Sequence, residues 1–124
     1  MPGALIHLAT GAALYLIGYV IFTSYTTGEH RLKHNLLLLL ACIIFSMAPD
    51  FFLGIYYLTH LEPAVVLMPL QVLTHHVITP VVIGILFLVS FVDQKRRPLW
   101  LMGATALIVH ILMDLFINET NFLW

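Results

Sequence analysis

Residues 99–117 read LWLMGATALIVHILMDLFI, an apolar run in which His110 and Asp114 are the ionisable residues. A run of about 20 apolar residues is long enough for a helix that crosses the hydrocarbon core of a membrane. His110 and Asp114 stand four positions apart, so on a helix both side chains project from one face. Because ionisable groups inside a membrane span are costly unless they are neutralised, this pair indicates a polar partner or a functional site.

The composition of the whole chain agrees with a membrane span. Of its 124 residues, 61% are hydrophobic and 9% are charged, and the mean hydropathy is +1.02. Soluble domains are far less apolar and carry more charge. We therefore expect an integral membrane protein with one domain over residues 1–124, in contact with membrane lipid, and the net charge of −1 gives no sign of a nucleic-acid partner.

The chain contains four apolar segments, at residues 4–22, 36–58, 64–92 and 99–117. Each is long enough to cross the membrane as a helix. The sequence therefore predicts an all-α fold, a bundle of four transmembrane helices.

The third segment is too long for one straight span, and it contains Pro69 and Pro80. Proline removes a helical hydrogen bond and bends the helix. We expect an interfacial turn first, then a spanning part over residues 68–92 with a kink near Pro80.

The basic residues are distributed unevenly between the two sides of this bundle. All of them fall in loops 23–35 and 93–98, which four spans place on one side; they are Arg31, Lys33, Lys95, Arg96 and Arg97. Loops rich in Lys and Arg face the cytoplasm. The protein is thus predicted to lie in the cytoplasmic (inner) membrane of the cell, with both termini outside. His30 and His34 have a zinc-like spacing but belong to the first basic loop, where we expect them to face solvent or lipid headgroups.

The ionisable residues of the four spans lie at similar depths in the membrane. His7 lies near the outer end of the first segment, Asp50 beyond the middle of the second and His75 early in the third, while His110 and Asp114 come late in the fourth. At 1.5 Å of rise per residue, all five fall in the outer half of the bundle. Unrelated polar residues would not be expected to lie at the same depth on four helices, so the spacing predicts one shared site.

Imidazole and carboxylate are ligands of zinc and related divalent metals. The five residues are enough for one such centre, and a bound cation would neutralise the buried carboxylates. A metal-bound water is a nucleophile at neutral pH, with a carboxylate such as Asp50 or Asp114 as ligand or general base. Pro49 cannot donate a helical hydrogen bond, so the backbone at Asp50 is expected to open toward the site.

The order of these motifs resembles a known family. The matching residues are Ile6-His7 with Thr10-Gly11, Ala48-Pro49-Asp50, Leu73-Thr74-His75, Val109-His110 with Asp114, and Phe122-Leu123-Trp124. They resemble the membrane-bound metal-dependent hydrolases called YdjM-like, and more distantly the zinc-dependent phospholipase C pattern. The resemblance implies a polytopic membrane hydrolase, and it selects His75 over His76. Phe52 and Leu70 stand where the family typically has an acid and a further histidine, which argues against a two-metal centre.

Three functions remain open at this point. The leading one is a zinc-dependent hydrolase acting on a phospholipid or another phosphate-bearing amphiphile. The second is a b-type cytochrome in which His110 and a histidine of the third segment ligate haem, although this leaves Asp50 and Asp114 unexplained. The third is a metal-free structural or partner-binding protein, whose polar groups only hold the helices together.

Overall fold

The computed structural model describes residues 3–59 and 64–116, and within these ranges the secondary structure is helical without strands. In chain order the elements are α1 (Ala4–Ile21), α2 (Thr23–Thr26), α3 (Arg31–Met47), the 3₁₀ turn η1 (Ala48–Asp50), α4 (Phe51–Thr59), α5 (Ala64–Leu73), the π-helical segment η2 (Thr74–Ile78), α6 (Thr79–Val92), the 3₁₀ turn η3 (Gln94–Arg96) and α7 (Arg97–Phe116). This confirms the predicted all-α fold.

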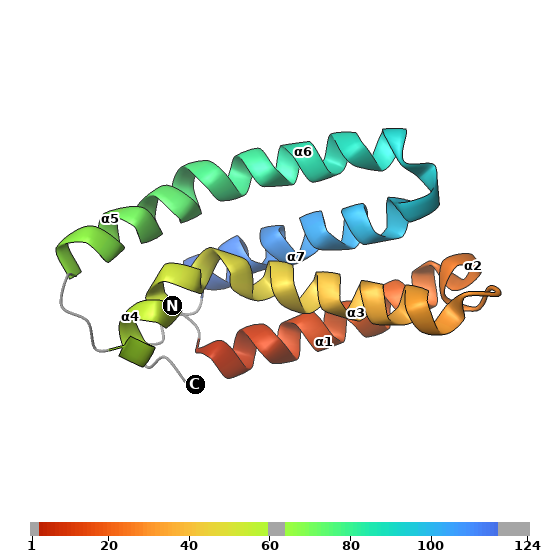
Figure 1. Ribbon diagram of the computed structural model, residues 1–124, viewed down its shortest axis with the longest axis horizontal. Coiled ribbons are helices and arrows are strands. Elements are labelled where there is room, and N and C mark those ends of the chain that lie inside the picture. Colours follow the sequence, from red (N-terminus) through yellow and green to blue (C-terminus); the bar gives the residue numbers. More distant parts are fainter. Residues whose placement is uncertain (1–2, 60–63, 117–124) are drawn as a thin grey trace.

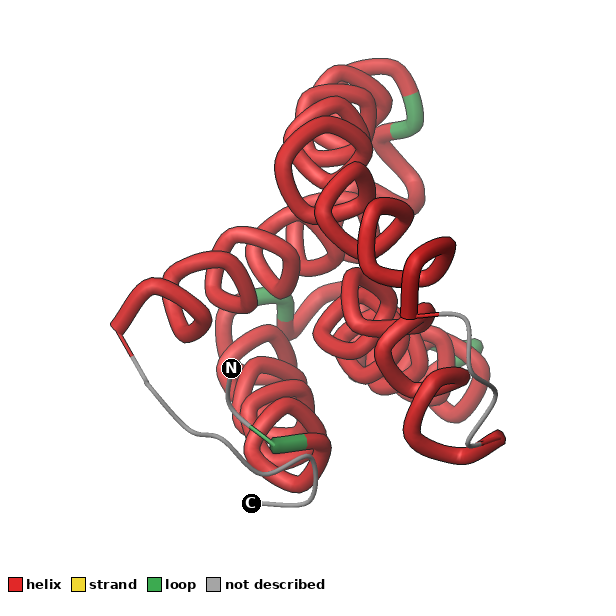
Figure 2. The backbone as a smooth tube through the Cα atoms, turned by 90° about the vertical axis from the view of Figure 1, so that its left-hand side faces the viewer, coloured by secondary structure: helices red, strands yellow, loops and turns green. Residues whose placement is uncertain are grey.

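Four helical stretches are long and apolar enough to cross a membrane, as the sequence predicted. They are Ala4–Ile21, Arg31–Tyr56, Leu67–Val92 and Gln94–Phe116. Figure 1 shows them running side by side along the long axis, and Figure 2 looks along the bundle from the end that carries α4 and α5. The chain therefore has the architecture of a four-helix membrane protein.

The core lies where α1, α3 and α7 meet. α3 packs against both α1 and α7, and α7 packs on its other side against α6. Leu38 and Cys42 of α3 and Ala106 of α7 are completely buried in this core. The face of α6 away from α7 is apolar and exposed, as at Leu88 and Phe91, which suits a helix whose remaining neighbour is lipid.

Two glycines of α1 permit close packing. Gly11 and Gly18 share the buried face of α1 with His7. A Cβ atom at Gly11 would lie 3.0 Å from the Cα atom of Ile43 and 3.1 Å from the carbonyl oxygen of Cys42, both of which belong to the backbone of α3. A side chain at this position would therefore press on the backbone of α3 and require it to shift by a few tenths of an ångström, as expected where small residues bring membrane helices close together.

The third span differs in detail from the prediction. The spanning part expected over residues 68–92 is confirmed, because the apolar helical stretch runs Leu67–Val92. The residues before it are helical rather than a turn, since α5 begins at Ala64 and includes Pro69. One missing hydrogen bond at a proline costs less than a length of unpaired backbone near hydrocarbon. The expected distortion near Pro80 is present one turn earlier, as the π-helical segment η2.

The segment η2 satisfies its own backbone. The N–H of Thr79 donates to the carbonyl of Thr74 five residues earlier, and the Thr79 hydroxyl donates to the same oxygen at 2.8 Å. A wide turn of this kind rotates the side chains that follow it and is frequent at functional sites. Here it lies beside the doublet His75-His76.

The second span changes direction at Pro49. The α-helix α3 ends at Met47, and the 3₁₀ turn η1 carries Pro49 and Asp50 before α4 begins. Pro49 is almost completely buried, and α4 leaves the axis of α3 in Figure 1. The predicted break around Asp50 is therefore present.

The first basic loop is more ordered than the sequence indicated. Residues 23–35 include α2 and the first turn of α3, because local hydrogen bonds continue the helical backbone beyond the apolar segments. His34 stacks on Tyr25 with ring centroids 4.2 Å apart, and its Nδ1 donates to the Tyr25 carbonyl at 2.9 Å. His34 thus holds α2 against α3, which corrects the expectation that it faces solvent or headgroups.

Candidate metal centre

Five side chains from all four spans meet at the end of the bundle that carries α4 and α5. His7 comes from the first turns of α1, Asp50 from η1 and His75 from η2, while His110 and Asp114 lie one turn apart near the end of α7. Both basic loops lie at the opposite end, on the right in Figure 1. The depth agreement read from the sequence is therefore a real proximity.

Four of the five side chains form a compact group. His7, Asp50, His110 and Asp114 each offer one ligand atom, and these atoms all lie within 4.8 Å of one another. His7 Nε2 lies 3.1 Å from Asp50 Oδ2, and His110 Nε2 lies 3.1 Å from Asp114 Oδ2. Ligands about 2.0–2.1 Å from a tetrahedral zinc ion would be separated by about 3.3 Å, so a divalent ion fits this group.

His75 contacts three members of the group. Its Nε2 lies 2.8 Å from Asp114 Oδ2, 3.4 Å from Asp50 Oδ1 and 3.0 Å from His110 Nε2. His76 is exposed, and its Nδ1 contacts the Val72 carbonyl instead. Of the doublet, His75 is thus the residue that faces the group.

One hydrogen bond fixes the tautomer of His110. His110 Nδ1 lies 2.8 Å from the Ser46 carbonyl, and because a carbonyl can only accept, the neutral ring has a bare Nε2. His75 Nδ1 lies near both the carbonyl and the amide nitrogen of Gln71, at 3.2 and 3.1 Å, so either tautomer of His75 can form. The bare Nε2 of His110 and Asp114 Oδ2 are 3.1 Å apart, and two such acceptors repel one another unless a proton or a cation lies between them.

Several buried polar atoms of the group lack a hydrogen bond within the described ranges. They are both ring nitrogens of His7 and Oδ1 of Asp114. His7 Nε2 lies close to Asp50 Oδ2, but the contact lacks hydrogen-bond geometry. Buried polar atoms without partners are rare and call for an explanation, and a bound cation supplies one for His7 Nε2 and Asp114 Oδ1.

Ser46 supports the group from α3 and was not anticipated from the sequence. Its hydroxyl donates to the His7 carbonyl at 2.7 Å, and its own carbonyl accepts from His110 Nδ1. Ser46 is completely buried, and its two hydrogen bonds join α3 to α1 and to α7. Its position four residues before Asp50 in the same apolar segment was the available signal, because residues four apart share one face of a helix.

Gln71 supports the group from α5 and was also missed. Its Nε2 donates to Asp50 Oδ1 at 2.9 Å, and its Oε1 accepts the backbone N–H of Leu53 at 3.1 Å. Gln71 therefore holds one oxygen of Asp50 and leaves Oδ2 turned toward His7 and His110. Such outer hydrogen bonds orient metal-binding carboxylates. A buried amide four residues before His75, inside an apolar span, was the signal in the sequence.

The geometry disfavours the haem alternative. A haem iron would lie between two imidazole nitrogens with the macrocycle spread around it. His75 Nε2 and His110 Nε2 are 3.0 Å apart, and the Asp114 carboxylate contacts both. These two histidines therefore leave no space for a porphyrin.

No protein-family model, curated protein or solved structure matches the chain. The likeness to the YdjM-like hydrolases therefore stays a prediction that depends on the motifs alone. Of these motifs, Phe122-Leu123-Trp124 lies outside the described residues, whereas the four that carry ionisable residues contribute to the group described above.

Proposed function

We propose that the protein is a membrane-embedded, zinc-dependent hydrolase of the YdjM-like kind. The observation that supports this most strongly is the convergence of imidazole nitrogens and carboxylate oxygens at one point, where His7 Nε2 and Asp114 Oδ1 are buried without a hydrogen bond to the described residues. The ion would be held by His7, Asp50, His110 and Asp114, with His75 beside it. When bound, such an ion lowers the pKa of water to near neutrality and polarises a phosphoryl oxygen.

The residues of the chain can supply the remaining steps. Hydrolysis adds one water across an ester bond, so that hydroxide joins phosphorus and the proton goes to the departing oxygen. His75 Nε2 lies 2.8 Å from Asp114 Oδ2, which is within reach of a proton moving between an acid and a base. Gln71 and Ser46 hold Asp50 and His110 in place, which preserves the arrangement while the substrate binds.

The proposed substrate is a phospholipid or another phosphate-bearing amphiphile. The side chains of Asp50 and Asp114 retain 12% and 14% of their exposure, so the group is not completely sealed. The group lies near one end of the membrane-spanning helices, and a phospholipid already holds its phosphate ester near the membrane surface. The alternative of a metal-free structural protein is disfavoured by the orphaned polar atoms, which a purely structural cluster would pair.

The orientation in the membrane can be tested with reporters. By the positive-inside rule, we expect both basic loops to lie in the cytoplasm. The four residues of the group, and His75 beside them, would then lie on the outer side. A reporter fused after Trp124 should show the activity of the exterior compartment, and one inserted near Arg96 that of the cytoplasm. The reverse pattern would place the group on the cytoplasmic side.

The activity can be tested with purified protein in uncharged detergent. We expect it to convert phosphatidylglycerol, or the general diester bis(p-nitrophenyl) phosphate, into a phosphate monoester and an alcohol, followed by ³¹P NMR. A chelator should abolish turnover and added zinc should restore it, because the ion supplies the activated water. Turnover that persists in chelator, or zinc-loaded protein that cleaves neither diester, would contradict a metal-dependent hydrolase.

A further inference from the structure

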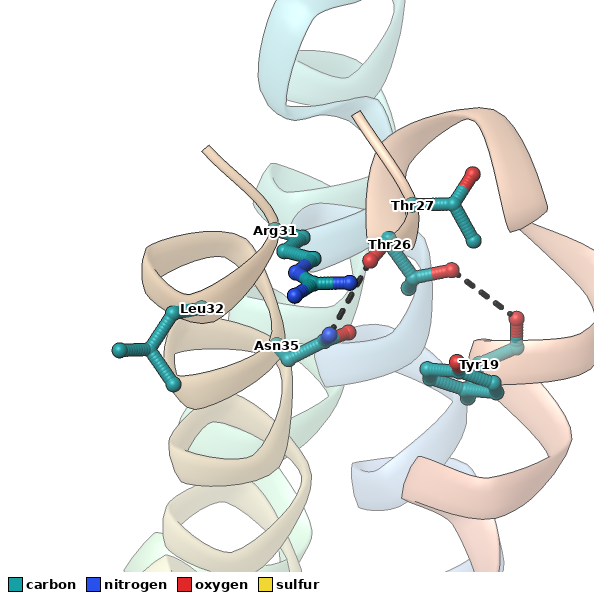
Figure 3. Close-up of a pocket in the computed structure, with 6 residues that line it drawn as sticks. All are labelled: Tyr19, Thr26, Thr27, Arg31, Leu32 and Asn35. Atoms are coloured by element: carbon teal, nitrogen blue, oxygen red, sulfur yellow. Dashed lines mark hydrogen bonds between the residues drawn. The ribbon is translucent and has the colours of Figure 1, made fainter. Parts of the chain in front are cut away.

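A second polar feature lies at the basic end of the bundle, away from the metal centre. It is a pocket of about 300 Å³ between the end of α1, α2 and the start of α3, shown in Figure 3. The lining residues are Tyr19, Thr26, Thr27, Arg31, Leu32 and Asn35. Hydroxyl, amide and guanidinium groups therefore share one cavity with an aliphatic side chain.

The walls of the pocket are held in place by hydrogen bonds. Asn35 Nδ2 donates to the Thr26 carbonyl at 3.0 Å, and the Thr26 hydroxyl donates to the Tyr19 carbonyl at 3.2 Å, both drawn in Figure 3. Thr26 is almost completely buried. The pocket thus has a fixed frame built from three successive elements, and little ordering is required of it on binding.

Arg31 gives the pocket an available positive charge. Across the described ranges its guanidinium has no carboxylate within salt-bridge distance, and no side chain caps the N-terminus of α3 at which it stands. Both an unpaired guanidinium and the positive end of a helix dipole favour an anion.

The two loops at this end of the bundle carry more positive than negative charge. The charges of Arg96 and Asp93 act on the Tyr25 hydroxyl, whose pKa is raised chiefly by burial, so the turn between α6 and α7 lies near α2. The Asp93 carboxylate is already engaged by Trp100 Nε1 and the backbone N–H of Arg96. The two loops of this end hold five basic residues against the two acidic residues Glu29 and Asp93, so a multiply charged anion is attracted.

The apolar rim indicates how the anion is presented. Leu32, which lines the pocket, is 82% exposed and lies at the start of the apolar stretch Arg31–Tyr56. On the neighbouring span, Val20 is 70% exposed. We propose that this pocket binds a phosphate group of an anionic phospholipid, with the Arg31 guanidinium on the phosphate and the acyl chains along the exposed faces of α1 and α3. The pocket and the metal centre lie at opposite ends, so this proposal is independent of the proposed hydrolysis.

Binding to the full-length protein in uncharged detergent tests the proposal by calorimetry. The probes are short-chain phosphatidylglycerol and inorganic phosphate, added in the presence of a chelator so that the metal centre does not hydrolyse the lipid. We expect saturable binding of the lipid, weakened about tenfold in Arg31→Gln, the usual scale for one charge-assisted hydrogen-bonded contact. Lys33→Gln is the matched control, because it removes one charge from the same end without lining the pocket. Thr27→Phe, which keeps every charge and fills the cavity, should weaken lipid binding as well.

The outcomes separate the sources of the phosphate. Tighter binding of the lipid than of inorganic phosphate, with dependence on Arg31, supports the proposal. Equal affinity for both, again dependent on Arg31, would mean that the pocket binds phosphate but does not recognise the lipid, and would overturn the lipid as the source of the phosphate. Loss of binding in Lys33→Gln equal to that in Arg31→Gln, or unchanged binding in both Arg31→Gln and Thr27→Phe, would overturn the pocket as a phosphate site.

Discussion

Asp114→Asn should lower the affinity of the protein for zinc by at least about 100-fold, the upper end of the loss seen when only an outer-shell partner is removed. Asp114 Oδ2 contacts both His75 Nε2 and His110 Nε2, and Oδ1 is buried without a hydrogen bond. The amide keeps the shape of the side chain but is a poorer ligand than the carboxylate. Competition with a chromophoric chelator measures the change.

A matched pair of histidine substitutions controls this result. His110→Ala should reduce zinc binding comparably, because it removes a buried imidazole from the group. His76→Ala should leave zinc binding unchanged, since His76 is exposed and its Nδ1 contacts the Val72 carbonyl rather than the group. Zinc binding that survives both Asp114→Asn and His110→Ala, or that is lost in His76→Ala, would mean that a metal is held elsewhere.

Asp50→Asn should separate metal binding from proton transfer. Asp50 Oδ1 is held by Gln71 Nε2, while Oδ2 faces His7 and His110. We expect Oδ2 to be a ligand, because a buried carboxylate is best stabilised by direct contact with a cation. The substitution should then reduce zinc content and turnover together.

The alternative role of Asp50 gives a different pair of measurements. If Asp50 is the general base, Asp50→Asn should keep the zinc but slow hydrolysis by about 10²–10⁴-fold, the usual contribution of a positioned base. Zinc content by elemental analysis and turnover by ³¹P NMR distinguish the two roles. Both quantities unchanged would contradict each role and would favour a structural cluster.

The fold and the convergence of the site were predictable because both follow from one-dimensional spacing. Segment lengths fix the number of spans, and alternating directions then fix the depth of each ionisable residue, which placed His7, Asp50 and His110 at one end. Pro49 marked the break beside Asp50 for a local reason, its missing N–H. Neither property depends on how the side chains pack.

The supporting residues were not predictable in the same way. Ser46 and Gln71 act through contacts between helices, and the rotation of each helix about its axis is set by packing that the sequence does not display. The choice between His75 and His76 had the same difficulty, because it depends on the π-helical turn η2. His34 was misjudged since its partner Tyr25 belongs to the short helix α2, which the apolar pattern does not reveal.

The metal content of the purified wild-type protein tests the central claim most directly. The chain should be extracted in uncharged detergent, dialysed without chelator and examined by elemental analysis and absorption spectroscopy. We expect about one zinc ion per chain, as for a centre of four protein ligands, and a colourless protein. Protein that contains no stoichiometric metal and binds none on addition of zinc, although folded, would contradict the account.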